Sequence, residues 1–280
     1  GAVRTVAWSP DGTRIASGSY DHRIRLRDTN TGTCLHILQG HESLVMSISW
    51  SPDGQWLASG SWDQTVRVWN STDGICRWIG HESEPVRTVA WNPDGTLVAS
   101  GNNSGMIHVW QGENGTQQKS MRTRNRAIYG IAWHPAGALL ASGGEDGVLR
   151  LWDTLRGTQS TIFADDHTPI TTVTWNHRGD QLISGSNDGM LRWWDSQNTM
   201  QIHAQQGHRA WIYANSVSPD DTLLASCGSD GLIQLWNLSN ATLHATLHSE
   251  RPYEALDVTN VQGLSEAQKV SLKLLGAFEN

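Results

Sequence analysis

The sequence predicts an all-β fold in which six four-stranded blades are arranged in a ring. Three observations lead to this prediction. Phrases of the type VAWSPDG recur along the chain at steps of 41 or 42 residues. Each phrase is followed by a second recurring segment of the type VWN or LWD. Helical periodicity is confined to the C-terminal end of the chain. Short strands repeated at this period are typical of a ring of blades.

The second unit shows how each repeat divides into four strands. Segments of strand-like composition lie at residues 45–50, 56–61, 65–69 and 75–79. Residues that favour tight turns separate them, at Ser51-Pro52-Asp53-Gly54, Asp63-Gln64 and Ser71-Thr72-Asp73-Gly74. The same division predicts six units, at approximately residues 2–41, 42–81, 82–126, 127–167, 168–208 and 209–247.

Residues 248–280 leave the repeat pattern. A short extended segment is followed by Ser265, and Gln268 three residues later completes a typical capping box. Apolar residues then share one helical face up to Gly276, a residue that favours a helix end. We predict a short strand and a helix at 265–276, and we expect the helix to dock on the ring or on a partner, because an isolated helix of this length is marginally stable.

The composition argues against several classes of function. The 280 residues include 20 Lys and Arg and 27 Asp and Glu, a net charge of −7, which is unlike a nucleic-acid-binding protein. No apolar run is long enough to span a membrane, and no signal peptide opens the chain. The cysteines Cys34, Cys76 and Cys227 are far apart, which predicts neither a disulfide framework nor a zinc site. We therefore expect a cytoplasmic protein without metal or cofactor.

Dipeptides at fixed places in the units identify a family resemblance. Gly-His occurs at Gly40-His41, Gly80-His81 and Gly207-His208, and Trp-Asp occurs at Trp152-Asp153 and Trp194-Asp195. These pairs, over about 245 of the 280 residues, resemble the WD40-repeat family of β-propellers. The resemblance implies an intact parent protein with seven blades, and a six-bladed ring is the alternative. The first unit lacks the lead-in found in the second, so we expect the chain to be a fragment.

The resemblance also implies a hydrogen-bond network of His, Ser, Asp and Trp within each blade. Complete sets are expected at His41/Ser59/Asp63/Trp69, His167/Ser184/Asp188/Trp194 and His208/Ser226/Asp230/Trp236. In the third unit His81, Ser100 and Trp110 are expected, with Ser104 in place of Asp. In the fourth unit Arg126 stands at the His place. Ser, His and Asp together also occur in hydrolases, but recurrence at the repeat period favours a structural role.

A Trp recurs at the period of the repeat, at Trp8, Trp50, Trp91, Trp133 and Trp175, and we interpret these residues as packing between neighbouring blades.

The family resemblance places partner-binding residues at two other positions in each unit. The position early in the first strand holds Arg4, Met46, Arg87, Tyr129, Thr171 and Tyr213. The residue before the turn Asp is Tyr20, Trp62, Asn103, Glu145, Asn187 or Ser229. Trp211, close to Tyr213, is expected to join them. We predict a protein-binding rim at Tyr20, Trp62, Met46, Arg87, Tyr129, Trp211, Tyr213 and Arg4, because aromatic residues and Arg are enriched in interaction hot spots.

Three functional hypotheses follow. The tail RPYEALDVTNVQGLSEAQKVSLKLLGA resembles that of bacterial WD-repeat proteins, in many of which the propeller is the sensor arm of a STAND-class NTPase. The first hypothesis is therefore a non-catalytic propeller that binds proteins, attached to an upstream signalling domain. The second is a free-standing scaffold. The third, a propeller-type hydrolase, would need acidic or His residues converging on the central channel, and no catalytic motif of that kind is present.

Overall fold

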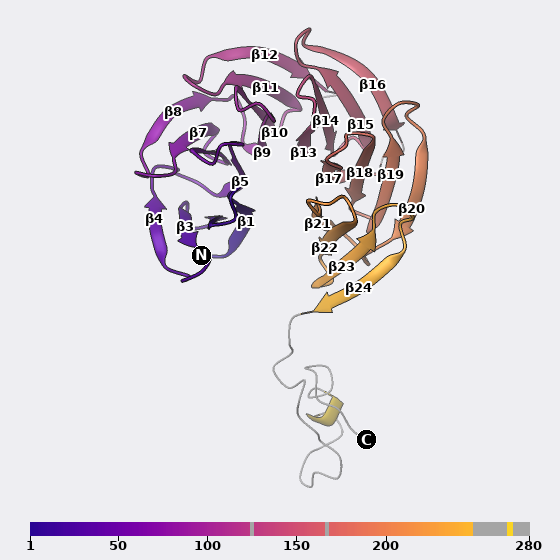
Figure 1. Ribbon diagram of the computed structural model, residues 1–280. Coiled ribbons are helices and arrows are strands. Elements are labelled where there is room, and N and C mark those ends of the chain that lie inside the picture. Colours follow the sequence, from indigo (N-terminus) through magenta and orange to yellow (C-terminus); the bar gives the residue numbers. More distant parts are fainter. Residues whose placement is uncertain (124–125, 166–167, 249–267, 271–280) are drawn as a thin grey trace.

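The computed structural model describes residues 1–123, 126–165, 168–248 and 268–270, and it contains six four-stranded antiparallel sheets arranged in an arc (Figure 1). This confirms the predicted all-β fold with six blades. Blade 1 comprises β1 (Val3–Trp8), β2 (Arg14–Ser19), β3 (Ile24–Asp28) and β4 (Cys34–Leu38). Blade 2 comprises β5 (Val45–Trp50), β6 (Trp56–Ser61), β7 (Thr65–Asn70) and β8 (Cys76–His81). Blade 3 comprises β9 (Val86–Trp91), β10 (Leu97–Asn102), β11 (Met106–Gln111) and β12 (Gln117–Arg122).

The second half of the chain repeats this arrangement. Blade 4 comprises β13 (Ile128–Trp133), β14 (Leu139–Gly144), β15 (Val148–Asp153) and β16 (Thr158–Asp165). Blade 5 comprises β17 (Ile170–Trp175), β18 (Gln181–Ser186), β19 (Met190–Asp195) and β20 (Gln201–Gln206). Blade 6 comprises β21 (Ile212–Val217), β22 (Leu223–Gly228), β23 (Leu232–Asn237) and β24 (Leu243–His248). The predicted tail strand and helix lie outside the described residues, except that residues 268–270 are helical.

Within each blade the strands follow one another in sequence order, so that the first strand is innermost and the fourth forms the outer edge (Figure 1). The first strands of consecutive blades contact one another, as β1 contacts β5 and β5 contacts β9. Residues from all six first strands therefore surround the centre of the arc, although they are far apart in the sequence.

Apolar residues pack between consecutive blades. Each of the five core clusters joins one blade to the next, and the cluster between blades 1 and 2 contains Leu26 and Trp50. The Trp50 indole is 8% exposed and donates a hydrogen bond to the carbonyl oxygen of Ala7 in blade 1 (3.1 Å). Trp133 and Trp175 make the equivalent bonds, and Trp91 is buried at the same position. The periodic Trp therefore stabilises the contact of its blade with the preceding blade.

Trp8 departs from the prediction that all five periodic Trp residues pack between blades. Its side chain is 61% exposed, and Val3 and Val6 of the same strand are also exposed. The reason is that the arc is open between blade 1 and blade 6, so that no sheet formed by the described residues covers this face of blade 1 (Figure 1). On the facing side, Ile233 and Leu247 of blade 6 are 44% and 49% exposed.

The hydrogen-bond sets of blades 2 and 6 have the same geometry. His41 Nδ1 lies 2.8 Å from Asp63 Oδ2, and its Nε2 lies 2.7 Å from Ser59 Oγ. The buried Trp69 indole donates to the same Ser59 hydroxyl (2.8 Å). In blade 6, the corresponding distances are 3.0 Å from His208 to Asp230, 2.8 Å from His208 to Ser226 and 3.0 Å from Trp236 to Ser226.

Blade 5 shows part of its expected set. Trp194 donates to Ser184 (2.9 Å), but His167 lies outside the described residues. Asp188 accepts hydrogen bonds from the Ser186 hydroxyl (2.7 Å) and from the Met190 backbone amide. These bonds stabilise the β18–β19 turn, in which Asp188 lies. Arg126 does not join a network in blade 4, because it is exposed and pairs with Glu145 (3.2 Å).

Blade 3 replaces the expected His with a carboxylate. Glu82, rather than His81, occupies the network position: its buried carboxylate accepts hydrogen bonds from Ser100 Oγ and Asn102 Nδ2. His81 ends β8 and is exposed. The difference follows from spacing, since the network residue precedes its Ser by 18 residues in blades 2, 3 and 6. Of two neighbouring residues on an extended chain, only one faces inward.

Candidate functional site

A β-bulge interrupts the innermost strand of every blade at the same place. In blade 1, Val3 pairs with Ser19 and Thr5 pairs with Gly18, which leaves Arg4 as the extra residue. The extra residues are Arg4, Met46, Arg87, Tyr129, Thr171 and Tyr213. These are the six residues that the sequence placed at the first rim position. Bulges redirect side chains and are over-represented beside functional sites.

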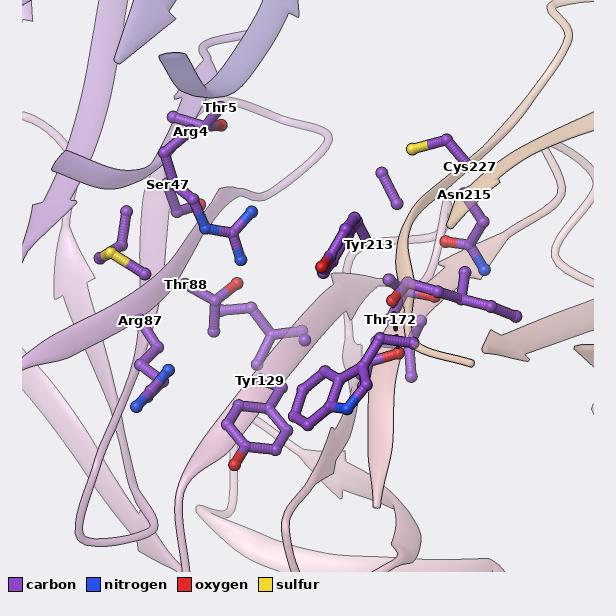
Figure 2. Close-up of a pocket in the computed structure, with 18 of the residues that line it drawn as sticks. Arg4, Thr5, Ser47, Arg87, Thr88, Tyr129, Thr172, Tyr213, Asn215 and Cys227 are labelled. Carbon is purple, nitrogen blue, oxygen red and sulfur yellow. Dashed lines mark hydrogen bonds between the residues drawn. The ribbon is translucent and has the colours of Figure 1, made fainter. Parts of the chain in front are cut away.

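The six bulges surround one cavity of about 600 Å³ at the centre of the arc (Figure 2). Every extra residue lines it, and Trp211 lines it as well. Arg4 is exposed, Arg87 and Tyr129 are half-buried, and Tyr213 is 52% exposed. The cavity therefore brings together two arginines and three aromatic side chains from four different blades.

Arg87 lies between two aromatic rings. Its guanidinium carbon is 5.2 Å from the centre of the Tyr129 ring and 5.6 Å from the centre of the Trp62 ring, both within cation–π range. Arg87 Nε also donates a hydrogen bond to Asn103 Oδ1, which holds the side chain in place. Tyr129 in turn meets Trp211 edge to face, with ring centres 5.9 Å apart. Four side chains thus form a continuous row, which we call the aromatic–arginine row: Trp62, Arg87, Tyr129 and Trp211.

The remaining predicted rim residues lie in different environments. Tyr20 is 45% exposed but is not among the residues that line the cavity. Met46 is 8% exposed, so that it contributes little accessible surface. The Thr171 hydroxyl is committed to the carbonyl oxygens of Gly185 (3.0 Å) and Ile212 (2.7 Å). The accessible part of the site therefore consists of the arginines and the aromatic residues.

Sequence analysis did not single out the residue after each bulge. Ser47, Thr88 and Thr172 line the cavity beside their bulged neighbours. A bulge sets two residues of one strand opposite a single residue of the next, so that two consecutive side chains reach the same space. The signal in the sequence is a single polar residue directly before an apolar residue of the strand, and it is too weak to identify a site by itself.

Two ionisable groups in the cavity wall are held in their neutral forms. Burial and the nearby Glu145 carboxylate raise the pKa of the Tyr129 hydroxyl, while the Arg87 charge acts in the opposite direction. Burial also raises the pKa of the Cys227 thiol, against the lowering effects of the Ala214 amide and of Arg4. At neutral pH the tyrosine is a hydrogen-bond donor and the cysteine is a thiol.

The described residues contain no group of three or more His, Cys, Asp and Glu placed to hold a metal ion. In the same parts of the chain, no helix is long and apolar enough to cross a membrane.

Comparison with known proteins decides the family. The family model described as the first β-propeller of IFT122 matches residues 2–256. The chain belongs to this family of WD40-type propellers. A segment of 45 residues is also 47% identical to human WD repeat-containing protein 86, and it covers 16% of this chain and 12% of the human protein. Both matches support the WD-repeat resemblance drawn from the sequence. The bacterial NTPase resemblance of the tail has no counterpart in them.

Proposed function

We propose that this chain is a non-catalytic propeller that binds a protein partner at the cavity in the centre of the arc. The observation that carries the proposal is the set of six bulges, which turns one residue from every blade into the same cavity. Rigid aromatic residues supply large contact areas at low entropic cost, and Trp, Tyr and Arg are enriched in interaction hot spots. Trp211 lines the cavity, and Trp62 lies beside it, against Arg87. They are 41% and 39% exposed, so that a partner can reach both.

The cavity composition favours binding over hydrolysis. Among the described residues that line it, none is Asp, Glu or His, the groups that a hydrolytic propeller would use as acid, base or nucleophile. The Ser–His–Asp combinations of blades 2 and 6 lie inside their blades, where the Ser hydroxyls accept hydrogen bonds from buried Trp side chains. A hydroxyl used in this way is not presented to a substrate.

Paired substitutions test the proposal. Trp62→Ala with Trp211→Ala should abolish co-purification of specific proteins from the source cell. Leu155→Ala is the matched control, because Leu155 is also exposed (74%). It lies in the β15–β16 turn of blade 4, at the opposite end of the strands from the β14–β15 turn, which corresponds to the β6–β7 turn that carries Trp62 in blade 2. Circular dichroism should show the same fold for all three proteins. Equal capture by the wild type and the double variant would refute the proposed binding face.

We also propose the finer hypothesis from the sequence, that the propeller is the sensor arm of a larger signalling NTPase, with a free-standing scaffold as the alternative. Its support is the sequence of the tail alone. Sequencing the coding DNA upstream of Gly1 tests it, since the sensor-arm hypothesis requires a continuous frame that encodes a phosphate-binding loop.

A further inference from the structure

The charge of the cavity is opposite to that of the chain. Arg4 and Arg87 line it, and no carboxylate is among its described lining residues, whereas the whole chain carries a net charge of −7. A local excess of positive charge in an acidic protein attracts anionic ligands and excludes cationic ones.

These two arginines differ from Arg25 and Arg150 on the third strands of blades 1 and 4. Arg25 pairs with Asp21 (2.7 Å), and Arg150 pairs with Asp146 (2.6 Å). Within the described parts of the chain, neither Arg4 nor Arg87 forms an ion pair with a carboxylate. Arg87 is nevertheless held by Asn103 and by the rings of the aromatic–arginine row, so that little conformational entropy is lost when it binds an anion.

The two guanidinium groups belong to blades that are not neighbours. Arg4 is on β1 and Arg87 is on β9, and β5 lies between them with Met46 at the equivalent bulge. Figure 2 shows both arginines on one side of the cavity, with Tyr213, Asn215 and Cys227 on the other. This separation suits two carboxylates spaced along a chain better than one phosphate, which needs donors that converge.

The wall also offers apolar contacts. Tyr129, Trp211 and Tyr213 present ring surface beside the arginines. An apolar side chain between two acidic ones would meet these rings.

We propose that the ligand of this cavity is an acidic peptide segment, in which two Asp or Glu side chains pair with Arg4 and Arg87 and an apolar or aromatic side chain packs on Tyr129, Trp211 and Tyr213. The inference rests on the proposed protein-binding function and specifies the chemistry of the partner. Arginine pairs with carboxylates through two parallel hydrogen bonds, which gives geometric selectivity as well as attraction.

Fluorescence anisotropy with labelled synthetic peptides tests the inference. The probe is a Glu-rich peptide with a central Trp, and the matched peptides carry Gln, Lys or phosphoserine at the Glu positions. The 280-residue chain should bind the Glu peptide at least about tenfold more tightly than the Gln or Lys peptide, with binding that weakens as salt increases. Equal binding of the Gln peptide, stronger binding of the Lys or phosphoserine peptide, or no binding of the Glu peptide at millimolar concentration would overturn it.

Arginine variants assign the effect to the cavity. Arg4→Gln with Arg87→Gln should weaken binding of the Glu peptide by about tenfold or more. Arg156→Gln is the matched control, since Arg156 has an 82% exposed side chain and pairs with Asp153 away from the cavity. Arg4→Gln alone removes an exposed side chain and should leave the fold intact while weakening binding, so that loss of structure in the double variant cannot hide the result. An unchanged affinity in Arg4→Gln and in the double variant would refute the assignment.

The outcome separates this inference from the proposed function. If Trp62→Ala with Trp211→Ala loses a cellular partner while no variant or peptide shows a preference for acidic groups, the binding face stands and the acidic ligand is wrong. If neither tryptophan matters to any partner, the proposed function itself fails.

Discussion

Glu82 accepts a hydrogen bond from Ser100 in blade 3, at the position where blades 2 and 6 use His41 and His208. The Trp110 indole donates to the same Ser100 hydroxyl (2.8 Å), so that the order of donors through the blade is conserved although the terminal acceptor has changed. His108 Nδ1 lies 3.5 Å from the Glu82 carboxylate. The Glu82 carboxylate can therefore end the hydrogen-bond network of a blade in place of the His–Asp pair of blades 2 and 6.

Glu82→Ala should destabilise the protein, whereas His81→Ala should not. Removing the carboxylate leaves the buried Ser100 and Asn102 donors without acceptors, which should lower the free energy of unfolding by about 2–4 kcal/mol. His81 is exposed, so its loss should change that free energy by no more than about 0.5 kcal/mol. Urea unfolding followed by Trp fluorescence measures both. Equal effects of the two substitutions would show that Glu82 does not hold the blade.

The periodic Trp residues should differ in importance according to whether a blade precedes them. Trp50→Ala should reduce the free energy of unfolding by about 3–5 kcal/mol, because Trp50 is buried and bonded to Ala7. Trp8→Ala at the equivalent place should cost about 1 kcal/mol or less, because Trp8 is 61% exposed. Denaturant midpoints provide the comparison. A large loss from Trp8→Ala would mean that another sheet covers blade 1 in solution.

In blades 1 to 5 a glycine opposite the bulge leaves room for the next blade, so that an added methyl group should have different effects at different positions. A Cβ at Gly101 would lie 2.7 Å from Ile128 Cγ2 of blade 4. Gly101→Ala should therefore destabilise by about 1–3 kcal/mol through overpacking. In blade 6 the residue opposite the bulge is Cys227, so Cys227→Ala is the matched control and should cost about 1 kcal/mol or less. Thermal unfolding of the two variants checks this; a neutral Gly101→Ala would contradict the packing argument.

The His41–Asp63 pair should make stability fall on acidification. Burial lowers the pKa of His41, while Asp63 acts in the opposite sense. Burial would raise the pKa of Asp63, but hydrogen bonds from His41, Thr65 and Glu42 hold that pKa well below its usual range. The unfolded chain then binds more protons than the folded one as the pH falls below about 6.5, and again below about 4, so that stability is lost in both ranges.

Unfolding by urea at pH 7.5, 6.0 and 5.0 tests this dependence. The wild type should lose stability between pH 7.5 and 5.0, and His41→Gln, which removes the titrating group, should show a smaller loss over the same range although it is less stable at pH 7.5. An identical pH dependence in the two proteins would contradict the assigned direction for His41.

Part of the site could be predicted from the sequence because it follows from the repeat. The family resemblance gives the first rim position as the residue four places before each unit's recurring Trp, or before Val217 in the sixth unit, and all six of these residues line one cavity. Counting cannot reveal that each is the extra residue of a bulge, since a bulge depends on the register between two strands. Neither could it place Arg87 between Trp62 and Tyr129, because those residues belong to blades 2, 3 and 4.

The sequence by itself determined the period, the four strands of each unit, the turns between them and the periodic Trp positions, because these depend on local patterns of apolar, Gly, Pro and Asp residues. Only the tertiary structure decided which of His81 and Glu82 faces inward, which periodic Trp is uncovered and which rim residues meet. Those outcomes depend on the presence and register of a neighbouring sheet. Contacts between residues tens of positions apart are set by how the blades pack, and no local pattern encodes them.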